Sequence, residues 1–361
     1  MSSSQQQQTP QTFKALCWPQ ENANQMEMRE VEWKQPRKGE IVIKVHAAGL
    51  NSTDNISRYN LIGTVHYPTT PGCNVVGEIV QVGEGVKHFK QGQHVAACLS
   101  HKGLAEYVVA HEQFTCALTE KQKAMEECVV AAWHGAKIEG SIRRFCREMD
   151  QEDHHRYEEI NKRMGFEGNG VCVVYGEGGC ARMALDIIRN CHASSSSRWM
   201  MKDSKLVLVT TSEKWNAQDY GMNAQDVLCV SKCDINKELR SRGGAKFVLA
   251  VDQPQQGFEA LLDGMRYRSE MVVLNPFRDQ LVQLPLGNLL AKDLSIRATV
   301  FADSKSIERA LELVEKNKIK IGCNKYQFDQ AQVNQAWKEM EMKEKFDAPI
   351  IMVHSHSSSS K

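Results

Sequence analysis

The chain has 361 residues, 42% of them hydrophobic and 25% charged, with a formal net charge of +1. A nearly neutral chain offers no basic face for nucleic acid, so we expect a small-molecule ligand instead. No run of about 18 apolar residues occurs, which excludes a membrane span. A chain of this length is expected to form two domains with separate cores.

The cysteines and the two ends of the chain indicate a cytoplasmic protein. Twelve cysteines are scattered along the sequence without a CxxC pair, which favours reduced, mostly buried thiols over disulfides or a zinc knuckle. Residues 1–12 lack the apolar core of a secretory signal and the arginines of a transit peptide. We expect residues 1–12 and 354–361 to be disordered extensions.

The first third of the chain predicts β-structure. Residues 13–118 contain short runs of alternating apolar and polar residues, such as 40–45 and 77–82, between glycine-containing turns. Thr119 then begins a helical pattern, as an N-cap before an acidic first turn. The strongly charged residues 143–170 predict a solvated helix or an extended excursion.

The middle of the chain alternates between strand and helix. Residues 171–175 form a continuous apolar run, which is typical of a strand buried on both faces of a parallel sheet. A glycine turn, a helix, a serine-rich loop and a second strand at 205–210 follow. Further strands are predicted at 227–231, 247–251 and 271–274, so we expect a doubly wound parallel sheet. Two amphipathic helices, 306–317 and 330–343, precede a last strand at 348–353.

Glycines in residues 71–86, PGCNVVGEIVQVGEGV, keep a fixed spacing at Gly72, Gly77, Gly83 and Gly85. Such glycines are typical of a twisted strand pair with close backbone approaches. The segment resembles the signature of the medium-chain dehydrogenase/reductase superfamily, and the resemblance extends over almost the entire chain.

The resemblance implies an α/β fold of two domains. A GroES-like β-rich domain would span 13–130 and 290–353, because in that superfamily the C-terminal segment returns to complete the first domain. A Rossmann domain with a doubly wound parallel sheet would span 131–289. Dimerisation is common in the resembled proteins, so a homodimer is one expected assembly.

The zinc ligands of the superfamily are replaced in this chain. Zinc members carry His-Glu where Cys73 and Asn74 stand, and a cysteine where Asn51 stands. Zinc prefers thiolate, imidazole or carboxylate ligands, so Asn51 is a poor one. The four-cysteine lobe of a structural zinc is also absent from the sequence. We therefore expect no metal site and no zinc cofactor.

Residues 49–60 resemble the GxNxxD element of zinc-independent quinone and enoyl reductases, and residues 102–109 resemble their GxxAEY strand. In that branch the protein mainly positions the hydride acceptor and supplies a proton. Asn51 is a candidate for orienting the substrate carbonyl or the nicotinamide ribose, or it is a turn-forming Asn. Tyr59 and Tyr67 are candidate proton donors or substrate-stacking groups, although Tyr67 can instead pack.

The cofactor loop is predicted at residues 176–181, GEGGCA, between a strand and a helix, which is the context of a GxGxxG/A motif. Its candidate residues are Gly176, Gly178, Gly179, Ala181 and Arg182. At the end of the next strand, Thr211, Ser212 and Lys214 resemble the set with which quinone reductases hold the 2′-phosphate, so NADPH is preferred over NADH. The alternative is a Rossmann-type turn that no longer holds a nucleotide.

Two functional hypotheses follow. The first is a zinc-independent, NADPH-dependent oxidoreductase that reduces a small quinone, enone or carbonyl compound by hydride transfer. The second is a catalytically degenerate member that acts as a structural or interaction subunit, with residues 143–170 as a docking element. Departures from the family pattern favour the second: Asn275-Pro276 replace a usual glycine, and residues 346–348 replace a usual Gly-Lys pair.

Overall fold

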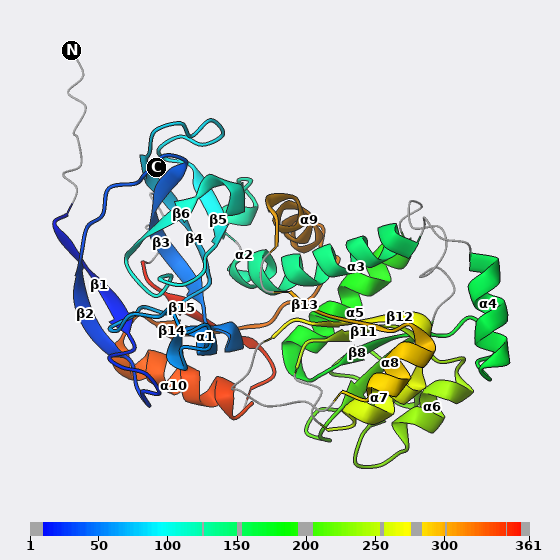
Figure 1. The fold of residues 1–361 in the computed structure, drawn as a ribbon. Helices are drawn as coiled ribbons and strands as arrows, with labels where there is room; N and C mark the ends of the chain where they lie inside the picture. Colours follow the sequence, from blue (N-terminus) through cyan, green and yellow to red (C-terminus); the bar gives the residue numbers. More distant parts are fainter. Residues whose placement is uncertain are drawn as a thin grey trace. The chain divides into compact units, whose positions relative to one another are not determined.

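The computed structural model divides into two compact units (Figure 1). The first unit comprises Met1–Val129, Asn324–Glu341 and Pro349–Lys361, and the second comprises Val130–Cys323 and Met342–Ala348. The structure describes residues 10–124, 126–149, 154–193, 205–252, 256–275, 284–299, 302–343 and 345–354. Among these residues, no helix combines the length and hydropathy needed to cross a bilayer.

The first unit is built on a seven-stranded sheet in the order β14-β15-β3-β4-β5-β7, with β6 paired to β3. The pairs from β15 to β7 and the β3–β6 pair are antiparallel. Its strands are β3 (Glu40–Gly49), β4 (Asn74–Val82), β5 (His94–Cys98), β6 (Tyr107–His111), β7 (Thr115–Ala117), β14 (Cys323–Gln327) and β15 (Ala348–Met352). A separate antiparallel pair consists of β1 (Thr12–Cys17) and β2 (Glu27–Glu32).

Short helices connect the strands of this unit. They are η1 (Ser52–Asp54), α1 (Asn55–Arg58), η2 (Glu112–Phe114), η3 (Gln122–Ala124), α2 (Glu127–Val130) and α10 (Gln330–Glu341). The core is apolar and includes Ile41, Ile43, Val75, Ile79 and Trp337. The prediction of a β-rich domain in this part of the chain is confirmed.

Close backbone approaches explain the glycine spacing of residues 71–86, as the sequence predicted. A Cβ atom on Gly77 would lie 2.1 Å from the carbonyl oxygen of Lys44 on the paired strand. A Cβ atom on Gly72 would lie 2.5 Å from the backbone nitrogen of Leu104, and its φ is +104°. Only glycine allows these close approaches.

The second unit contains a six-stranded sheet in the order β10-β9-β8-β11-β12-β13, and every pair is parallel. In chain order this is 3-2-1-4-5-6, the order of a Rossmann dinucleotide-binding sheet. The strands are β8 (Val171–Tyr175), β9 (Lys205–Thr210), β10 (Val227–Cys229), β11 (Ala245–Ala250), β12 (Met265–Val273) and β13 (Ser295–Ala298). The predicted α/β fold is therefore confirmed.

Helices cover both faces of this sheet. They are η4 (Ala131–Gly135, a π-helix), α3 (Ala136–Met149), α4 (His154–Arg163), α5 (Gly178–Ala193), η5 (Ala224–Asp226), α6 (Ile235–Ser241), α7 (Phe258–Gly264), α8 (Leu286–Lys292) and α9 (Ser304–Glu315). Helices α3 and α5 pack together on one side, and α6, α7 and α8 lie on the other (Figure 1). All five residues of β8 are buried, as a strand covered on both faces requires.

Residues 290–323 lie in the second unit, whereas the sequence placed everything from residue 290 in the GroES-like domain. Strand β13 pairs with β12 and extends the parallel sheet. Helix α9 packs closely on α3: a Cβ atom on Gly140 would lie 2.9 Å from Ser306 Oγ. The return to the first unit begins at Asn324.

The charged segment 143–170 forms the end of α3 and helix α4, and residues 150–153 lie outside the described residues. Helix α4 is tied to strand β12. The guanidinium of Arg266 donates to Glu158 at 2.6 Å, and the side-chain oxygen of Asn161 accepts from the Tyr267 backbone at 2.9 Å. Arg266 is buried, so this helix is part of the second unit's packing.

Candidate functional site

The predicted cofactor loop connects β8 to α5 at the centre of the second sheet. Strand β8 pairs with β9 on one side and β11 on the other, so the loop lies at the switch point where Rossmann sheets bind ligands. Gly176 and Gly178 have φ angles of +139° and +68°, which an L side chain rarely adopts. The predicted position between strand and helix is confirmed.

Every backbone N–H of residues 176–179 has a partner within the chain. Three acceptors come from segments far away in the sequence: the Asp252 carboxylate, the Tyr220 hydroxyl and the Phe346 carbonyl. The four bonds are Gly176 N to Val209 O at 3.0 Å, Glu177 N to Asp252 Oδ2 at 3.0 Å, Gly178 N to Tyr220 OH at 3.2 Å, and Gly179 N to Phe346 O at 2.6 Å.

We call residues 343–347 the closing segment; Glu344 is outside the described residues. Its Phe346 carbonyl oxygen lies 2.9 Å from where a Cβ atom on Gly179 would be, so it fills the space that the glycine leaves. The Phe346 ring contacts Trp215 edge-on, with centroids 5.2 Å apart, and Tyr220 at 5.4 Å. These contacts fix the segment over the N-terminus of α5.

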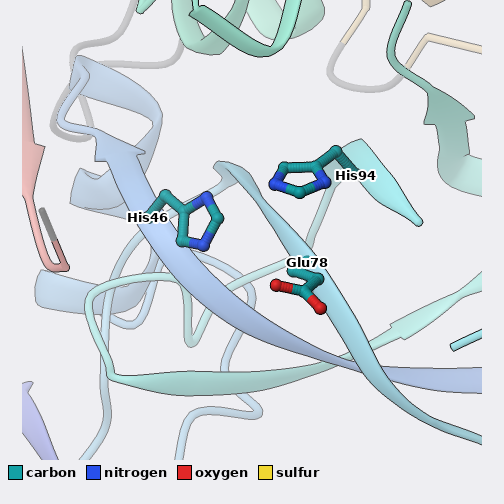
Figure 2. Close-up of side chains that lie close together, drawn as sticks. All are labelled: His46, Glu78 and His94. Carbon is teal, nitrogen blue, oxygen red and sulfur yellow. The ribbon is translucent and has the colours of Figure 1, made fainter. Parts of the chain in front are cut away.

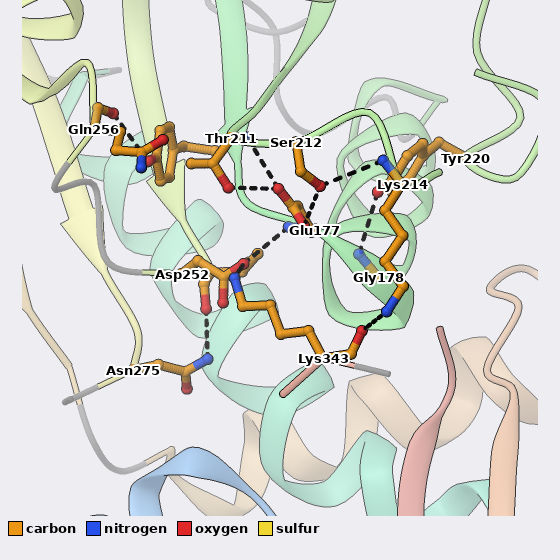
Figure 3. A network of polar contacts seen from close by, with 12 residues as sticks. Glu177, Gly178, Thr211, Ser212, Lys214, Tyr220, Asp252, Gln256, Asn275 and Lys343 are labelled. Atoms are coloured by element: carbon orange, nitrogen blue, oxygen red, sulfur yellow. Dashed lines mark hydrogen bonds and ion pairs between the residues drawn. The ribbon is translucent and has the colours of Figure 1, made fainter. Parts of the chain in front are cut away.

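Lys343 and Lys214 add polar contacts to the closing segment (Figure 3). The Lys343 ammonium pairs with Asp252 Oδ2 at 2.9 Å. The Lys214 ammonium donates to the backbone carbonyl of Lys343 and also lies over the Trp215 ring. Lys214, predicted for the 2′-phosphate, therefore holds the closing segment in this conformation.

Thr211 and Ser212, which were also predicted to bind the 2′-phosphate, donate hydrogen bonds to Glu177 instead (Figure 3). Its carboxylate accepts from the backbone N–H of Thr211 at 3.0 Å, from the Thr211 hydroxyl, and from the Ser212 hydroxyl at 3.1 Å. Burial alone would raise the pKa of Glu177, but the Thr211 bonds, the charge of Lys343 and the Ser212 bond together lower it. Glu177 is thus held as a carboxylate beside the loop.

The remaining predicted cofactor residues lie on helix α5. Ala181 is fully buried, consistent with the packing role expected of the third motif position. Arg182 turns away from the loop: its Nε lies 3.3 Å from Asp186, and its Nη1 donates to the carbonyl of Asp219 at 2.7 Å.

A diphosphate at a Rossmann loop needs unoccupied backbone N–H donors and no carboxylate beside them. Here the N–H groups of residues 176–179 are engaged, and the carboxylates of Glu177 and Asp252 are next to them. The described conformation of the loop therefore does not fit a dinucleotide. The fit requires that the closing segment release Gly179 and that Glu177 and Gly178 give up their bonds to Asp252 and Tyr220.

Asn51 in the first unit has two structural tasks. Its side-chain oxygen accepts from Thr53 N at 3.0 Å and caps helix η1, and Asp54 accepts from the Asn51 backbone in return. Its amide nitrogen donates to the side-chain oxygen of Asn74 at 3.0 Å. Asn51 is buried, so this geometry agrees with the turn-forming alternative.

The two candidate tyrosines differ in their surroundings. The Tyr67 hydroxyl donates to the backbone carbonyls of Ser57 at 2.9 Å and Arg58 at 3.2 Å, and burial raises the pKa of Tyr67. Its proton is therefore committed to the backbone. The Tyr59 ring instead lies against the Arg58 guanidinium, whose Cζ is 5.0 Å from the ring centroid.

The positions of the superfamily's zinc ligands are also engaged within the first unit. Cys73 donates to Asp54 Oδ1 at 3.3 Å, and the same oxygen accepts from Gly72 N at 2.7 Å. Asp54 thus organises the Asn51 and Cys73 segments together.

Sequence reasoning missed Tyr220, Asp252 and Lys343 as parts of the loop's surroundings. They lie far from residues 176–179 in the sequence, and nothing in their local pattern marks them. The only sequence feature that pointed to this region was at residues 346–348, where the expected Gly-Lys pair is missing.

Comparisons with known proteins agree with this architecture. Residues 37–145 match the model of the alcohol dehydrogenase GroES-like domain. The chain is 28% identical over 308 residues to an acryloyl-coenzyme A reductase of Metallosphaera sedula, covering 81% of this chain and 86% of that one. A chloroplastic quinone-oxidoreductase homolog of Spinacia oleracea is 39% identical over 103 residues, which are 27% of this chain and 31% of that one.

Solved structures resemble the fold as well. A quinone oxidoreductase of Pseudomonas syringae superposes with a TM-score of 0.69 at 18% identity, covering 94% of this chain and all of that one. At this identity the likeness shows the fold alone. The domain match and the sequence relatives show a likeness to alcohol dehydrogenases and to acryloyl-coenzyme A and quinone reductases.

Proposed function

We propose that the protein is a zinc-independent oxidoreductase that uses a nicotinamide dinucleotide, and that its nucleotide loop is closed in the conformation described here. The observation that carries the proposal is the 3-2-1-4-5-6 parallel sheet with a glycine loop at its switch point. The relatives named as acryloyl-coenzyme A and quinone reductases support the reaction class.

We propose NADPH as the preferred nucleotide and a small quinone, enone or carbonyl compound as the substrate. Thr211, Ser212 and Lys214 follow β9, where the adenosine ribose is recognised in this fold. In the closed conformation they bind Glu177 and the Lys343 carbonyl. They become available to an anion only when these contacts are given up.

Closure has a quantitative consequence for affinity. If only a fraction of the molecules have the closing segment displaced, the apparent Kd exceeds the intrinsic Kd by the inverse of that fraction. We therefore propose weak nucleotide binding by the isolated protein. Tyr59 and Tyr67 remain the proposed proton donors, and the Tyr67 hydroxyl would have to give up its bonds to the backbone carbonyls of Ser57 and Arg58 to act as one.

A second candidate function is supported by the same loop. Each N–H of residues 176–179 has an internal acceptor, and two of the surrounding groups are carboxylates, Glu177 and Asp252. A loop satisfied in this way is also what a non-catalytic member would have, acting as a structural or interaction subunit. Residues 143–170 are the proposed contact region of such a subunit.

Nucleotide titration separates the two candidates. A ligand that binds only the native state raises the melting temperature, so we expect a larger rise with NADPH than with NADH for the oxidoreductase. The same titration is made on Phe346→Ala, in which the closing segment is weakened. If neither protein responds to either nucleotide, the non-catalytic function is favoured. A larger response to NADH would contradict the roles proposed for Ser212 and Lys214.

A further inference from the structure

Three side chains of metal-ligand type lie together on the sheet of the first unit. His46, Glu78 and His94 come from strands β3, β4 and β5, and their ligand atoms all lie within 4.8 Å of one another (Figure 2). The imidazole rings of His46 and His94 have centroids 5.3 Å apart. His46 is buried, whereas Glu78 and His94 are partly exposed, so solvent reaches the cluster.

The strand register brings these residues together. Glu78 lies directly opposite His94 in the antiparallel β4–β5 pair. In the β3–β4 pair, the register shifts between Val45 and Ala47, which leaves His46 as the extra residue of a bulge. A bulge redirects a side chain relative to the regular alternation. Three rigid, neighbouring strands thus present the three side chains on one face.

The chemistry of the three groups matches one class of ligand. Two imidazoles and one carboxylate form a donor set that zinc uses in proteins, with a fourth position left to water. The carboxylate also offsets part of the charge of a divalent cation. We propose that His46, Glu78 and His94 bind a Zn²⁺ ion.

The distances require only a small adjustment. Donor atoms about 2.0–2.1 Å from a tetrahedral ion lie roughly 3.4 Å apart, compared with at most 4.8 Å in the described cluster. Rotation of the partly exposed Glu78 and His94 side chains can close this gap without moving the strands. Glu120, whose carboxylate interacts with the charge of His94, is bonded to Lys123 at 2.6 Å and is not counted as a ligand.

The site is separate from the ligand positions of the zinc alcohol dehydrogenases, which correspond here to Asn51 and Cys73. It does not depend on the oxidoreductase function, and we assign the ion no catalytic step. The proposal differs from the sequence-based expectation that the chain has no metal site, and the experiment below decides between them. Sequence analysis did not find this cluster because 32 positions separate His46 from Glu78 and 16 separate Glu78 from His94.

Cobalt substitution tests the proposal on the full-length protein. After treatment with a chelator and dialysis, we expect one Co²⁺ per chain to produce visible d–d absorption bands, and Zn²⁺ to abolish them. At a hundredfold excess of Zn²⁺ over its Kd, the melting temperature should rise by roughly 5–10 °C.

Variants decide which residues hold the ion. Glu78→Gln keeps the shape of the side chain, and we expect it to weaken Co²⁺ binding at least tenfold; His94→Ala should abolish the bands. His88→Ala removes an exposed histidine of the same unit and should leave binding unchanged. Unchanged binding in both Glu78→Gln and His94→Ala would overturn the proposal. Thiolate charge-transfer bands would also overturn it, since they would assign the ion to the cysteines.

Discussion

Replacing Phe346 by alanine should open the nucleotide loop. The Phe346 ring contacts Trp215 and Tyr220, and its carbonyl oxygen accepts the Gly179 N–H at 2.6 Å. Each aromatic pair is worth about 0.5–1.5 kcal/mol beyond simple burial, so losing two pairs weakens closure by roughly 1–3 kcal/mol. If the closed conformation dominates, apparent nucleotide affinity should improve by roughly 5- to 150-fold.

Isothermal titration of NADPH into the wild type and Phe346→Ala measures this change directly. Phe328→Ala is the matched control, because Phe328 packs against the core of the first unit, whereas the loop belongs to the second unit. Circular dichroism of each variant checks that the fold is retained. An unchanged or weaker affinity in a folded Phe346→Ala protein would refute the closing role of the segment.

Three further predictions concern the loop and the first sheet. Lys214→Ala should weaken NADPH binding more than NADH binding, measured by titration, if the ammonium meets the 2′-phosphate; equal losses would count against that role. The pKa of Glu177 is lower in the folded protein than in the unfolded chain, so the carboxylate contributes its full stabilisation above about pH 4.3, the usual glutamate pKa. This contribution is lost as the pH falls through the lower folded-state pKa. Acid unfolding of Glu177→Gln should therefore depend less steeply on pH, and an identical acid profile would argue against the network. Gly77→Ala places a methyl group 2.1 Å from the Lys44 carbonyl oxygen and should lower the free energy of unfolding in urea by about 3 kcal/mol or more. The control is Gly287→Ala, whose methyl group meets no atom within 4 Å and should not destabilise the protein. Equal urea midpoints for the two variants would contradict the close approach.

Local patterns in the sequence predicted much of the fold. The fully apolar run 171–175 predicted a strand covered on both faces, and β8 has all five residues buried. The glycines at 176 and 178 marked a turn that only positive φ angles can form. Such signals act over a few residues, so they can be recognised without knowledge of the tertiary structure.

Contacts between distant segments could not be predicted in the same way. Phe346 lies over Gly179 although more than 160 positions separate them, and residues 346–348 suggested only that the usual Gly-Lys pair was missing. His46, Glu78 and His94 meet through strand register and a bulge, neither of which the apolar alternation encodes. The sequence also placed residues 290–323 in the first domain, because nothing in them shows that β13 extends the parallel sheet.

The chain leaves the first unit after Glu341 and returns to it at Pro349, so the closing segment is tethered at both ends. Seven extended residues span at most about 25 Å, and a group on so short a tether has an effective concentration of the order of millimolar. The Phe346 carbonyl therefore acts as an intramolecular competitor that dilution cannot remove. A nucleotide would have to outcompete the chain itself at every protein concentration.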